Sequence, residues 1–547
     1  MSETRANVLD NLPKPALIGI FIASVIGIFF VQSQLNTQRG QLSPTYIEPL
    51  QDAPPMLTLT TETLGGFRGL ISSYLWLRSN EMQLEKNYPE QMQLAEWITQ
   101  LQPTVPAGWV NRSWNMAYNI SRNYPDRESR WSYVYDAVAM LRDEGIRYNP
   151  QEPLVYDQLA YIFQHKIGHN LDDHHRFYKF MWMQHMGNTL WADLNASHAA
   201  HGVPDFDALI NPNPADTNLV DRVRRLRQEY KLDPREMKAV HQKYGLARDH
   251  EGKIVRDAEG KPKHCLDWRM AETHSLYWAS LGLKRCSLSA GREEEIFKLE
   301  KKVYVSMMYT FRRGKLNMES GATIPPGEFF TGNLLISPNL ESGGSVHKAY
   351  MDMIALAQES RQHHLTGGTS EMGHIHFLRR FIQWLYFYNR ETEARHWLKV
   401  AIDTYPDKMR WFPGYNPNTK TYNLDEIVYD GMADDMQRGG AEETLALMDG
   451  VLTKHFFYLA DGNEEMAANY FNLAKDVHNK YAEKYKKATG RMGIAPFEPM
   501  RIMRLRAFLI EKNKTVTANL RKQLGQAEDW LPDPPSANPG PGPGPGP

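Results

Sequence analysis

Residues 389–406 have the sequence NRETEARHWLKVAIDTYP, and the spacing within this stretch decides the predicted fold. A turn residue is followed by a small residue, a large apolar residue, a second small residue and a proline, namely Asn389, Ala394, Leu398, Ala401 and Pro406. The offsets recur without the proline at Gly462, Ala467, Phe471 and Ala474. This spacing predicts a turn followed by a helix that packs closely against a neighbouring helix.

The predicted helix has the pattern of the second half of a tetratricopeptide-type helical hairpin. Ala394 and Ala401 let two antiparallel helices approach closely, and Leu398 fills the groove between them. A partial match occurs at Ala137 and Leu141. Close helix packing in an ordinary bundle is the alternative. Because a single hairpin cannot bury its own apolar face, the repeats predict an all-α, tetratricopeptide-like solenoid whose concave face binds other chains.

Composition narrows the class of protein further. The 547 residues are 42% hydrophobic, and 63 basic residues balance 64 acidic ones to a formal charge of -1. A dedicated nucleic-acid binder would carry a basic excess, so no nucleic-acid partner is predicted. The two cysteines, Cys265 and Cys286, flank a predicted helix of roughly 25 Å, which is too long for a disulfide between its ends. Both thiols are therefore predicted to be free.

An apolar, uncharged run at residues 16–31 (ALIGIFIASVIGIFFV) predicts a transmembrane anchor over residues 15–32. A cleaved signal peptide and a buried core helix are the alternatives, but the flank lacks a small-residue cleavage pattern. Arg5 and Lys14 precede the run and Arg39 follows it. This bias favours a single-pass protein whose bulk is extracytoplasmic, which in bacteria means periplasmic.

The rest of the chain divides by composition and helical periodicity. We predict an N-terminal tail (1–14), the anchor (15–32), a stalk (33–60), a helical-repeat region (61–201), an irregular helical middle region (202–345), a C-terminal tetratricopeptide-like region (346–514) and a Pro/Gly-rich tail (515–547). Within the middle region, residues 248–261 predict a polar hairpin and residues 314–345 a long irregular insertion.

Four segments carry a family resemblance: LGGFRGLISSYLWLR (64–78), WNMAYNI (114–120), LRDEGIRYNP (141–150) and LDWRMAETHSLYWASLGL (266–283). Over most of residues 60–410 the chain resembles uncharacterised, membrane-anchored tetratricopeptide-repeat-like proteins of planctomycete-type bacteria. The resemblance implies a bacterial envelope setting. It implies no catalytic residues.

The densest group of side chains that could bind a metal lies at residues 164–186, which contain five histidines and two aspartates. His165 and His169 would share a helix face, as the ligands of an H-E-x-x-H zinc site do, but Lys166 replaces the catalytic glutamate. A metal site built from His169, Asp172, His174 and His175 is the alternative to a capped turn with surface histidines. No other cofactor is predicted.

A second cluster places His363, His364, His374 and His376 around residues 365–373 (LTGGTSEMG). Residues 366–370 could cradle a phosphate or metal only if they led into a helix N-terminus. The preferred interpretation is a helix beginning near Ser370, capped by Thr369 or Ser370. No P-loop lysine or nucleophile elbow is present.

These patterns favour a membrane-anchored scaffold that binds or organises other envelope proteins. A fixed structural subunit of a larger membrane complex is one alternative, and a metal-dependent enzyme that uses the His165–His175 region is another. The scaffold prediction makes other proteins the expected partners.

Overall fold

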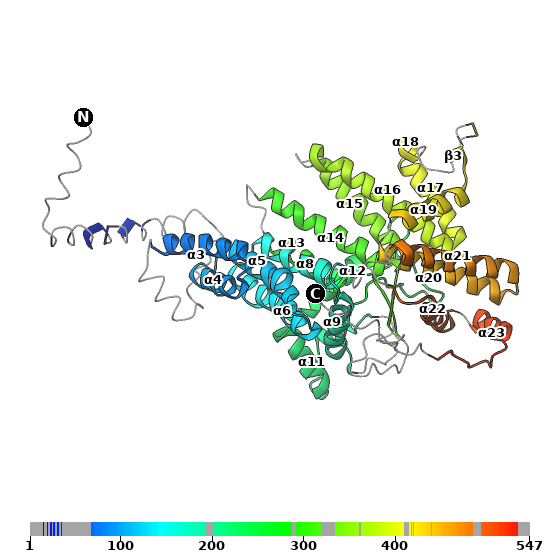
Figure 1. Cartoon of the computed structure of the whole chain (residues 1–547), viewed down its shortest axis with the longest axis horizontal. Helices are drawn as coiled ribbons and strands as arrows, with labels where there is room; N and C mark the ends of the chain where they lie inside the picture. The colour runs from blue at the N-terminus through cyan, green and yellow to red at the C-terminus, as the bar shows by residue number, and fades with distance from the viewer. Residues whose placement is uncertain are drawn as a thin grey trace. The chain divides into compact units, whose positions relative to one another are not determined.

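The computed structural model describes residues 67–192, 202–286, 292–318, 334–359, 363–409, 415–416, 418–419, 421–438, 440–484, 494–512 and 514–533, with scattered residues between 15 and 34. The described residues are mostly helical, with two short two-stranded sheets, which confirms the all-α class (Figure 1). Contacts divide the chain into two units, Met1–Val155 and Tyr156–Pro547. The predicted anchor lies mainly outside the described residues. No described helix has the length and apolarity to cross a membrane.

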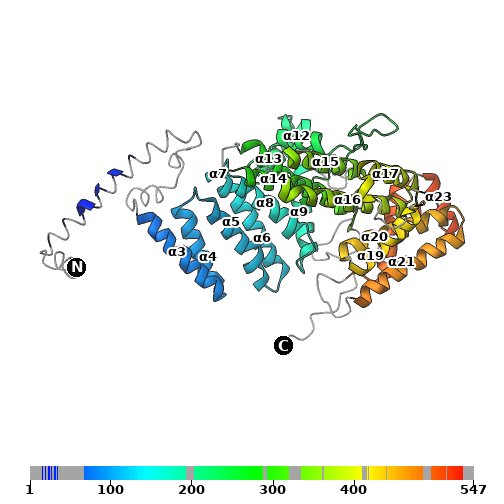
Figure 2. The same ribbon diagram turned by 90° about the horizontal axis from the view of Figure 1, so that it is seen from above.

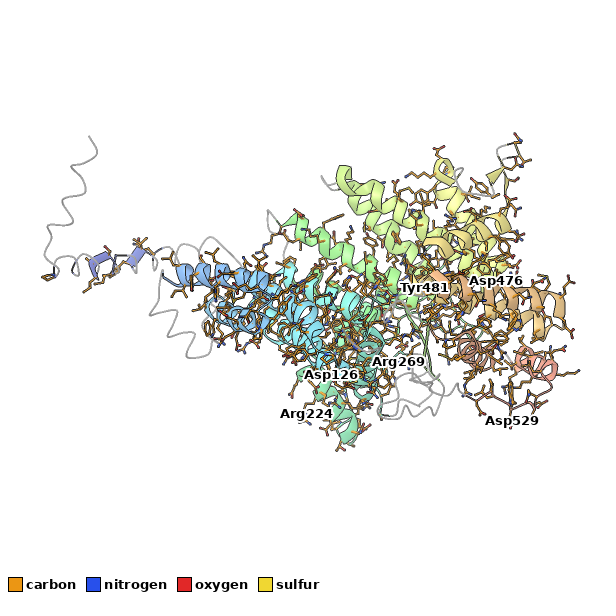
Figure 3. All side chains as sticks on the ribbon, viewed as in Figure 1. Asp126, Arg224, Arg269, Asp476, Tyr481 and Asp529 are labelled. Atoms are coloured by element: carbon orange, nitrogen blue, oxygen red, sulfur yellow. The ribbon has the colours of Figure 1, made fainter. Side chains whose placement is uncertain are left out.

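The described helices of the first unit form a row. The α-helices among them are α3 (Phe67–Leu84), α4 (Tyr88–Leu101), α5 (Pro106–Trp114), α6 (Arg127–Met140) and the short α7 (Ile146–Tyr148), and π-helical turns at Asn115–Ile120 and Leu141–Gly145 and a 3-10 turn at Ser121–Asn123 lie between them. Helix α3 packs on α4, α4 on α5 and α5 on α6 (Figure 2). Asp126, labelled in Figure 3, starts α6 because its carboxylate accepts the backbone N–H of Ser129 at 2.6 Å. Ala137 and Leu141 are fully buried in this unit.

The second unit begins within α8 (Pro153–Tyr161). Its helices are α9 (His175–Leu190), α10 (Phe206–Ile210), α11 (Thr217–Gln228), α12 (Pro234–Tyr244), α13 (Ala271–Arg285), α14 (Glu293–Arg313), α15 (Gly343–Glu359), α16 (His363–Phe387), α17 (Glu391–Thr404), α18 (Pro406–Met409), α19 (Leu424–Arg438), α20 (Ala441–Ala460), α21 (Glu464–Lys484), α22 (Phe497–Glu511) and α23 (Lys514–Gln523). Helices α13 to α17 pack in chain order. Helix α20 then packs on α16 and also contacts α21, α22 and α23, so this end is a bundle around α20.

Three hairpins share one turn geometry. The residue between the paired helices has positive φ: 58° at Lys86 (α3–α4), 61° at Asn389 (α16–α17) and 74° at Gly462 (α20–α21). In each, the next backbone N–H donates to a carbonyl five residues earlier, in the bonds Asn87 to Met82 (2.9 Å), Arg390 to Leu385 (2.8 Å) and Asn463 to Tyr458 (2.9 Å). This is the Schellman arrangement, which ends a helix and reverses the chain. The turns predicted at Asn389 and Gly462 are therefore confirmed.

The helices after two of these turns bury the small residues that the sequence singles out. Ala394, Ala401, Ala467 and Ala474 are each at most 2% exposed, and Leu398 is also buried. Phe471 is half-buried and contacts the rings of His455 and Phe497. Pro406 follows the last residue of α17 by two positions, as a helix-ending proline should.

The middle region departs from the expectation of an irregular insertion. Strands β1 (Lys315–Met318) and β2 (Leu334–Ser337) pair antiparallel, with Lys315 opposite Ser337. Residues 319–333 lie outside the described residues. The second sheet pairs β3 (Tyr415–Asn416) with β4 (Thr421–Tyr422). Strand pairing at 315–337 therefore corrects the prediction of a long irregular insertion, and the apolar residues Leu316 and Ile336, which lie opposite each other, give only a weak local signal for it.

Residues 248–263 are two copies of one eight-residue motif, RDHEGKIV and RDAEGKPK. In each copy the aspartate carboxylate, of Asp249 or Asp257, accepts the backbone N–H of the lysine four residues later. Ala247, Val255 and Lys263, eight residues apart, close a ring of backbone hydrogen bonds: 247 donates to 263, 263 to 255 and 255 to 247. Antiparallel bridges join Arg248 to Ile254 and Arg256 to Pro262, so the predicted polar hairpin is confirmed, and each copy of the motif makes a turn of its own.

Two further predictions concern the cysteines and the C-terminal tail. Neither Cys265 nor Cys286 forms a disulfide, as predicted, and both are buried. Helix α23, with Thr517 and Leu520 buried, occupies the start of the segment assigned to the Pro/Gly-rich tail, so that tail begins later than residue 515. Residues 534–547, which hold the Pro/Gly repeats, lie outside the described residues.

Candidate functional site

Asp172, one of the four predicted metal ligands, is held in a buried ion pair. Its Oδ2 accepts a hydrogen bond from Lys166 Nζ at 2.6 Å, and the two side chains are only 6% and 3% exposed. Its Oδ1 accepts from the Tyr178 hydroxyl at 3.1 Å and from the backbone N–H of His174 at 2.9 Å. Both carboxylate oxygens are thus engaged. Asp172 fixes the turn before α9, and the lysine beside it would repel a cation.

The three predicted histidine ligands occupy different positions around this turn. The His169 ring stacks on His165, with centroids 6.0 Å apart, and meets the Tyr309 ring edge-on at 5.9 Å. Burial, reinforced by the Arg313 charge, lowers the pKa of His169 to about 4. His175 is the first residue of α9, and its Nδ1 lies 3.0 Å from Lys179 Nζ. His174 occupies the position just before α9.

These four side chains do not form a coordination sphere. In the part of the chain that the structure describes, no three or more His, Cys, Asp or Glu side chains are grouped so that they could hold a metal ion. The sequence places the four residues close together along the chain, but their side chains are turned to different neighbours. The metal hypothesis gains no support from this geometry.

What the region does build is a buried ionic cluster centred on Arg313, the last residue of α14. Its guanidinium bonds Glu272, in the first turn of α13, and Nη1 donates to Glu442, in the first turn of α20, at 3.0 Å. Nη2 donates to the backbone carbonyl of Gln164 at 3.1 Å. The guanidinium also lies over the Tyr309 ring, 4.3 Å from its centroid. Arg313 therefore joins three helix ends and a π-helical turn.

Burial and charge complementarity decide the protonation states in this Arg313 cluster. The side chains of Arg313 and Glu272 are 4% and 1% exposed. Burial alone would raise the pKa of Glu442, but the charges of Arg313 and Arg312 lower it to about 2. Glu442 is consequently ionised at neutral pH, and the cluster holds opposite charges out of water. Such a cluster is stable only while each charge keeps its partner.

Sterics at Gly168 show how closely the cluster is packed. A methyl group on Gly168 would lie 2.5 Å from Oε1 of Glu272 and 3.0 Å from the carbonyl oxygen of Gln164. The π-helical turn Ile162–Ile167 ends at this glycine and presents the Gln164 carbonyl to Arg313. π-Helical turns redirect backbone groups in this way and recur at functional positions. The glycine is needed here because a carboxylate occupies the space of its missing side chain.

Lys179 is the most perturbed amine near the cluster. Burial, followed by the repulsion of Arg313, lowers the pKa of Lys179 to about 7. A neutral lysine amine is a potential base or nucleophile. The Cys265 thiol offers no second nucleophile, because burial raises its pKa to about 12. The Arg313 cluster can therefore hold the ends of α13, α14 and α20 together through ion pairs. Beside it, the amine of Lys179 has a lowered pKa.

The second histidine cluster is part of the helical interior. Helix α16 begins at His363 and runs through residues 366–370, so the prediction of a helix start near Ser370 is wrong. Backbone N–H groups within a helix bond to carbonyls of the preceding turn and are unavailable to an anion. His374 is fully buried, with its ring nitrogens 3.0 Å from His347 Nδ1 and 2.8 Å from the Tyr405 hydroxyl. The stretch therefore packs α15 and α16 together.

The chain matches no known protein-family model, and no curated protein is significantly similar to it in sequence. Sequence reasoning missed the Arg313 cluster, because its members lie between residues 164 and 442 and share no local spacing. The only available signal is a glutamate in the first turn of both α13 and α20, and this is ordinary at helix N-termini.

Proposed function

We propose that the chain is a membrane-anchored, tetratricopeptide-like scaffold that binds or organises other envelope proteins. The observation that carries the proposal is the recurrence of one Schellman hairpin turn at Lys86, Asn389 and Gly462. Repeated hairpins of this kind stack into surfaces whose common use is to hold other chains. The apolar run at residues 16–31 and the family resemblance support the anchor and the envelope setting.

The consecutive packing of α13 to α17 supports a solenoid-like surface in the second unit. Within this stretch, Met351 on α15 and Met372 on α16 are exposed, by 38% and 46%. Methionine side chains are flexible and polarizable, which suits contacts with partner proteins. The Arg313 cluster, by contrast, is occupied by contacts within the chain. A protein partner is therefore the binding class that these features favour.

A mild-detergent pull-down with crosslinking mass spectrometry tests the proposal. We expect a small set of partners whose crosslinks to the α15–α16 surface fall at least tenfold in a Met351→Ser/Met372→Ser variant. Ile510→Ser on α22 is the matched control, because Ile510 is also apolar and 51% exposed. A partner set that is unchanged in the methionine variant would contradict binding at this surface.

The same experiment separates the alternatives. Co-purification with other subunits in fixed stoichiometry through detergent would favour a structural subunit of a larger complex. Stoichiometric metal, with an activity that is lost on His169 or His174 substitution, would favour an enzyme. Neither outcome is expected from a scaffold with exchangeable partners.

A further inference from the structure

Helix α3 is apolar on two sides. One side packs on α4, where Leu75 and Met82 form a core cluster with Leu94 and Ile98. The side turned away from α4 carries the outer stripe, defined as Leu70, Tyr74, Leu77 and Leu84, whose members are 68%, 65%, 71% and 85% exposed. A helix that is apolar on opposite faces is normally covered on both. Helix α3 is also the first helix in the row of the first unit (Figure 2).

The spacing of the outer stripe is that of a helix–helix seam. Leu70, Leu77 and Leu84 are seven residues apart, and Tyr74 lies between the first two, four residues after Leu70. Apolar residues that repeat at seven-residue intervals with a member between them keep one face toward a partner helix along its whole length. The stripe is therefore shaped for a second helix that runs beside α3.

Glu81 is the only charged residue in this seam, and its charge is already compensated. Arg78 Nη1 lies 2.8 Å from Glu81, and Arg78 Nη2 lies 3.0 Å from Glu90 on α4. Burying this pair in lipid would remove its hydration without a new partner. Glu81 lies in the last turn of α3, so at this end of a protein–protein seam the pair can keep water and its partner. The charge pattern thus favours a protein helix over a bilayer as the occupant.

We propose that the outer stripe is a self-association surface on which α3 pairs with α3 of a second copy of this chain. Two copies present the same heptad spacing to each other, so the leucines of one seam meet apolar residues of the other at every second turn. Burying four large side chains on each copy removes on the order of 1,000 Å² of surface, about the minimum for a specific interface. The pairing does not depend on the scaffold function proposed above.

A cysteine at the centre of the stripe tests the pairing in the full chain. Under mild oxidation in detergent, Leu77→Cys should form a disulfide-linked dimer. Trp97→Cys on α4 is the matched control, since Trp97 is apolar and 45% exposed but lies outside the stripe. The native cysteines are buried and should not crosslink in the wild type. Equal crosslinking of the two variants, or none of Leu77→Cys, would overturn the proposal.

Mass measurement by light scattering in the same detergent gives an independent readout. We expect a wild-type dimer, and at least tenfold weaker association in a Leu70→Ser/Leu77→Ser/Leu84→Ser variant with unchanged helix content. If that variant unfolds, the crosslinking of Leu77→Cys decides whether two copies pair through the outer stripe. A monomeric wild type, a dimer that survives the triple substitution, or stripe-dependent binding to lipid vesicles or to an unrelated protein without dimerisation would each contradict pairing between copies.

Discussion

Lys86, Asn389 and Gly462 hold the same left-handed backbone conformation with three different side chains. Glycine takes this conformation without strain, asparagine tolerates it, and lysine pays about 1 kcal/mol for its Cβ. This ranking explains which turns could be predicted. Asn389 and Gly462 are recognisable turn residues, whereas Lys86 gives no such signal, although its hairpin closes with the same hydrogen bonds.

The conformation at these turns predicts the sign of single substitutions. Gly462→Ala should lower the free energy of unfolding by about 1–2 kcal/mol, because alanine is strained at positive φ. Lys86→Gly should raise it by up to about 1 kcal/mol. Urea unfolding monitored by circular dichroism measures both. Gly69→Ala is the control with the opposite sign, since an added methyl group at this position in α3 meets no atom within 4 Å. A neutral Gly462→Ala would contradict the turn geometry.

Asp172 predicts a second residue-scale effect. Asp172→Ala leaves the Lys166 ammonium buried without its partner, so we expect a loss of about 3–5 kcal/mol in urea unfolding. The double variant Lys166→Met/Asp172→Ala removes the stranded charge and should recover much of that loss. Added zinc should change neither result. Stabilisation of the wild type by zinc that is lost in Asp172→Ala would instead support the metal hypothesis.

Elements far apart in sequence meet at Arg313, and this is where prediction from sequence fails most clearly. The cluster needs α13, α14 and α20 in register before any of its charges has a partner. Periodicity predicts that each helix exists, but it does not say which helix ends meet. The pairing of strands β1 and β2 was not predicted for a related reason, because its backbone bonds join segments that have only weak patterns of their own.

The Arg313 cluster predicts that the start of α20 depends on one ion pair. Glu442→Gln should speed hydrogen exchange in the first turns of α20 and cost about 1–3 kcal/mol, because Arg313 keeps Glu272. Arg313→Met should cost more, about 3–5 kcal/mol, since two buried carboxylates lose their shared cation. Glu464→Gln, in the exposed first turn of α21, is the control and should change exchange little. Exchange that is equally slow in all variants would mean that packing alone holds α20.

At the scale of the molecule, the helical class and the recurring hairpins follow from spacing in the sequence. The division at Val155–Tyr156 does not, because it falls inside α8, where neither proline nor glycine interrupts the helix. Several histidines of the second unit occupy buried positions, where apolar side chains are usual. Together they make the stability of this unit depend on pH.

Acid should destabilise the second unit through these buried histidines. Burial lowers the pKa values of His241, His274, His347 and His374 to about 3, 4, 4 and 3. The unfolded chain binds these protons near pH 6.5 and the folded chain only near pH 4 or below. The unfolded state therefore holds more protons in this range, so stability is full above pH 6.5 and falls toward pH 4.

Each such histidine contributes a slope of up to about 1.4 kcal/mol per pH unit. Urea unfolding at pH 7.5, 5.5 and 4.5 measures the total slope. His274→Gln should make it shallower, because His274 is fully buried with Nε2 bonded to the Trp268 carbonyl at 2.9 Å. His396→Gln, at an exposed position, is the matched control. Carboxylates also lose stabilising charge below about pH 4.5. The test is therefore the difference in the slope of unfolding free energy against pH between the His274→Gln and His396→Gln variants from pH 6.5 to 4.5. Parallel curves for His274→Gln and wild type would show that folding does not lower the pKa of this imidazole.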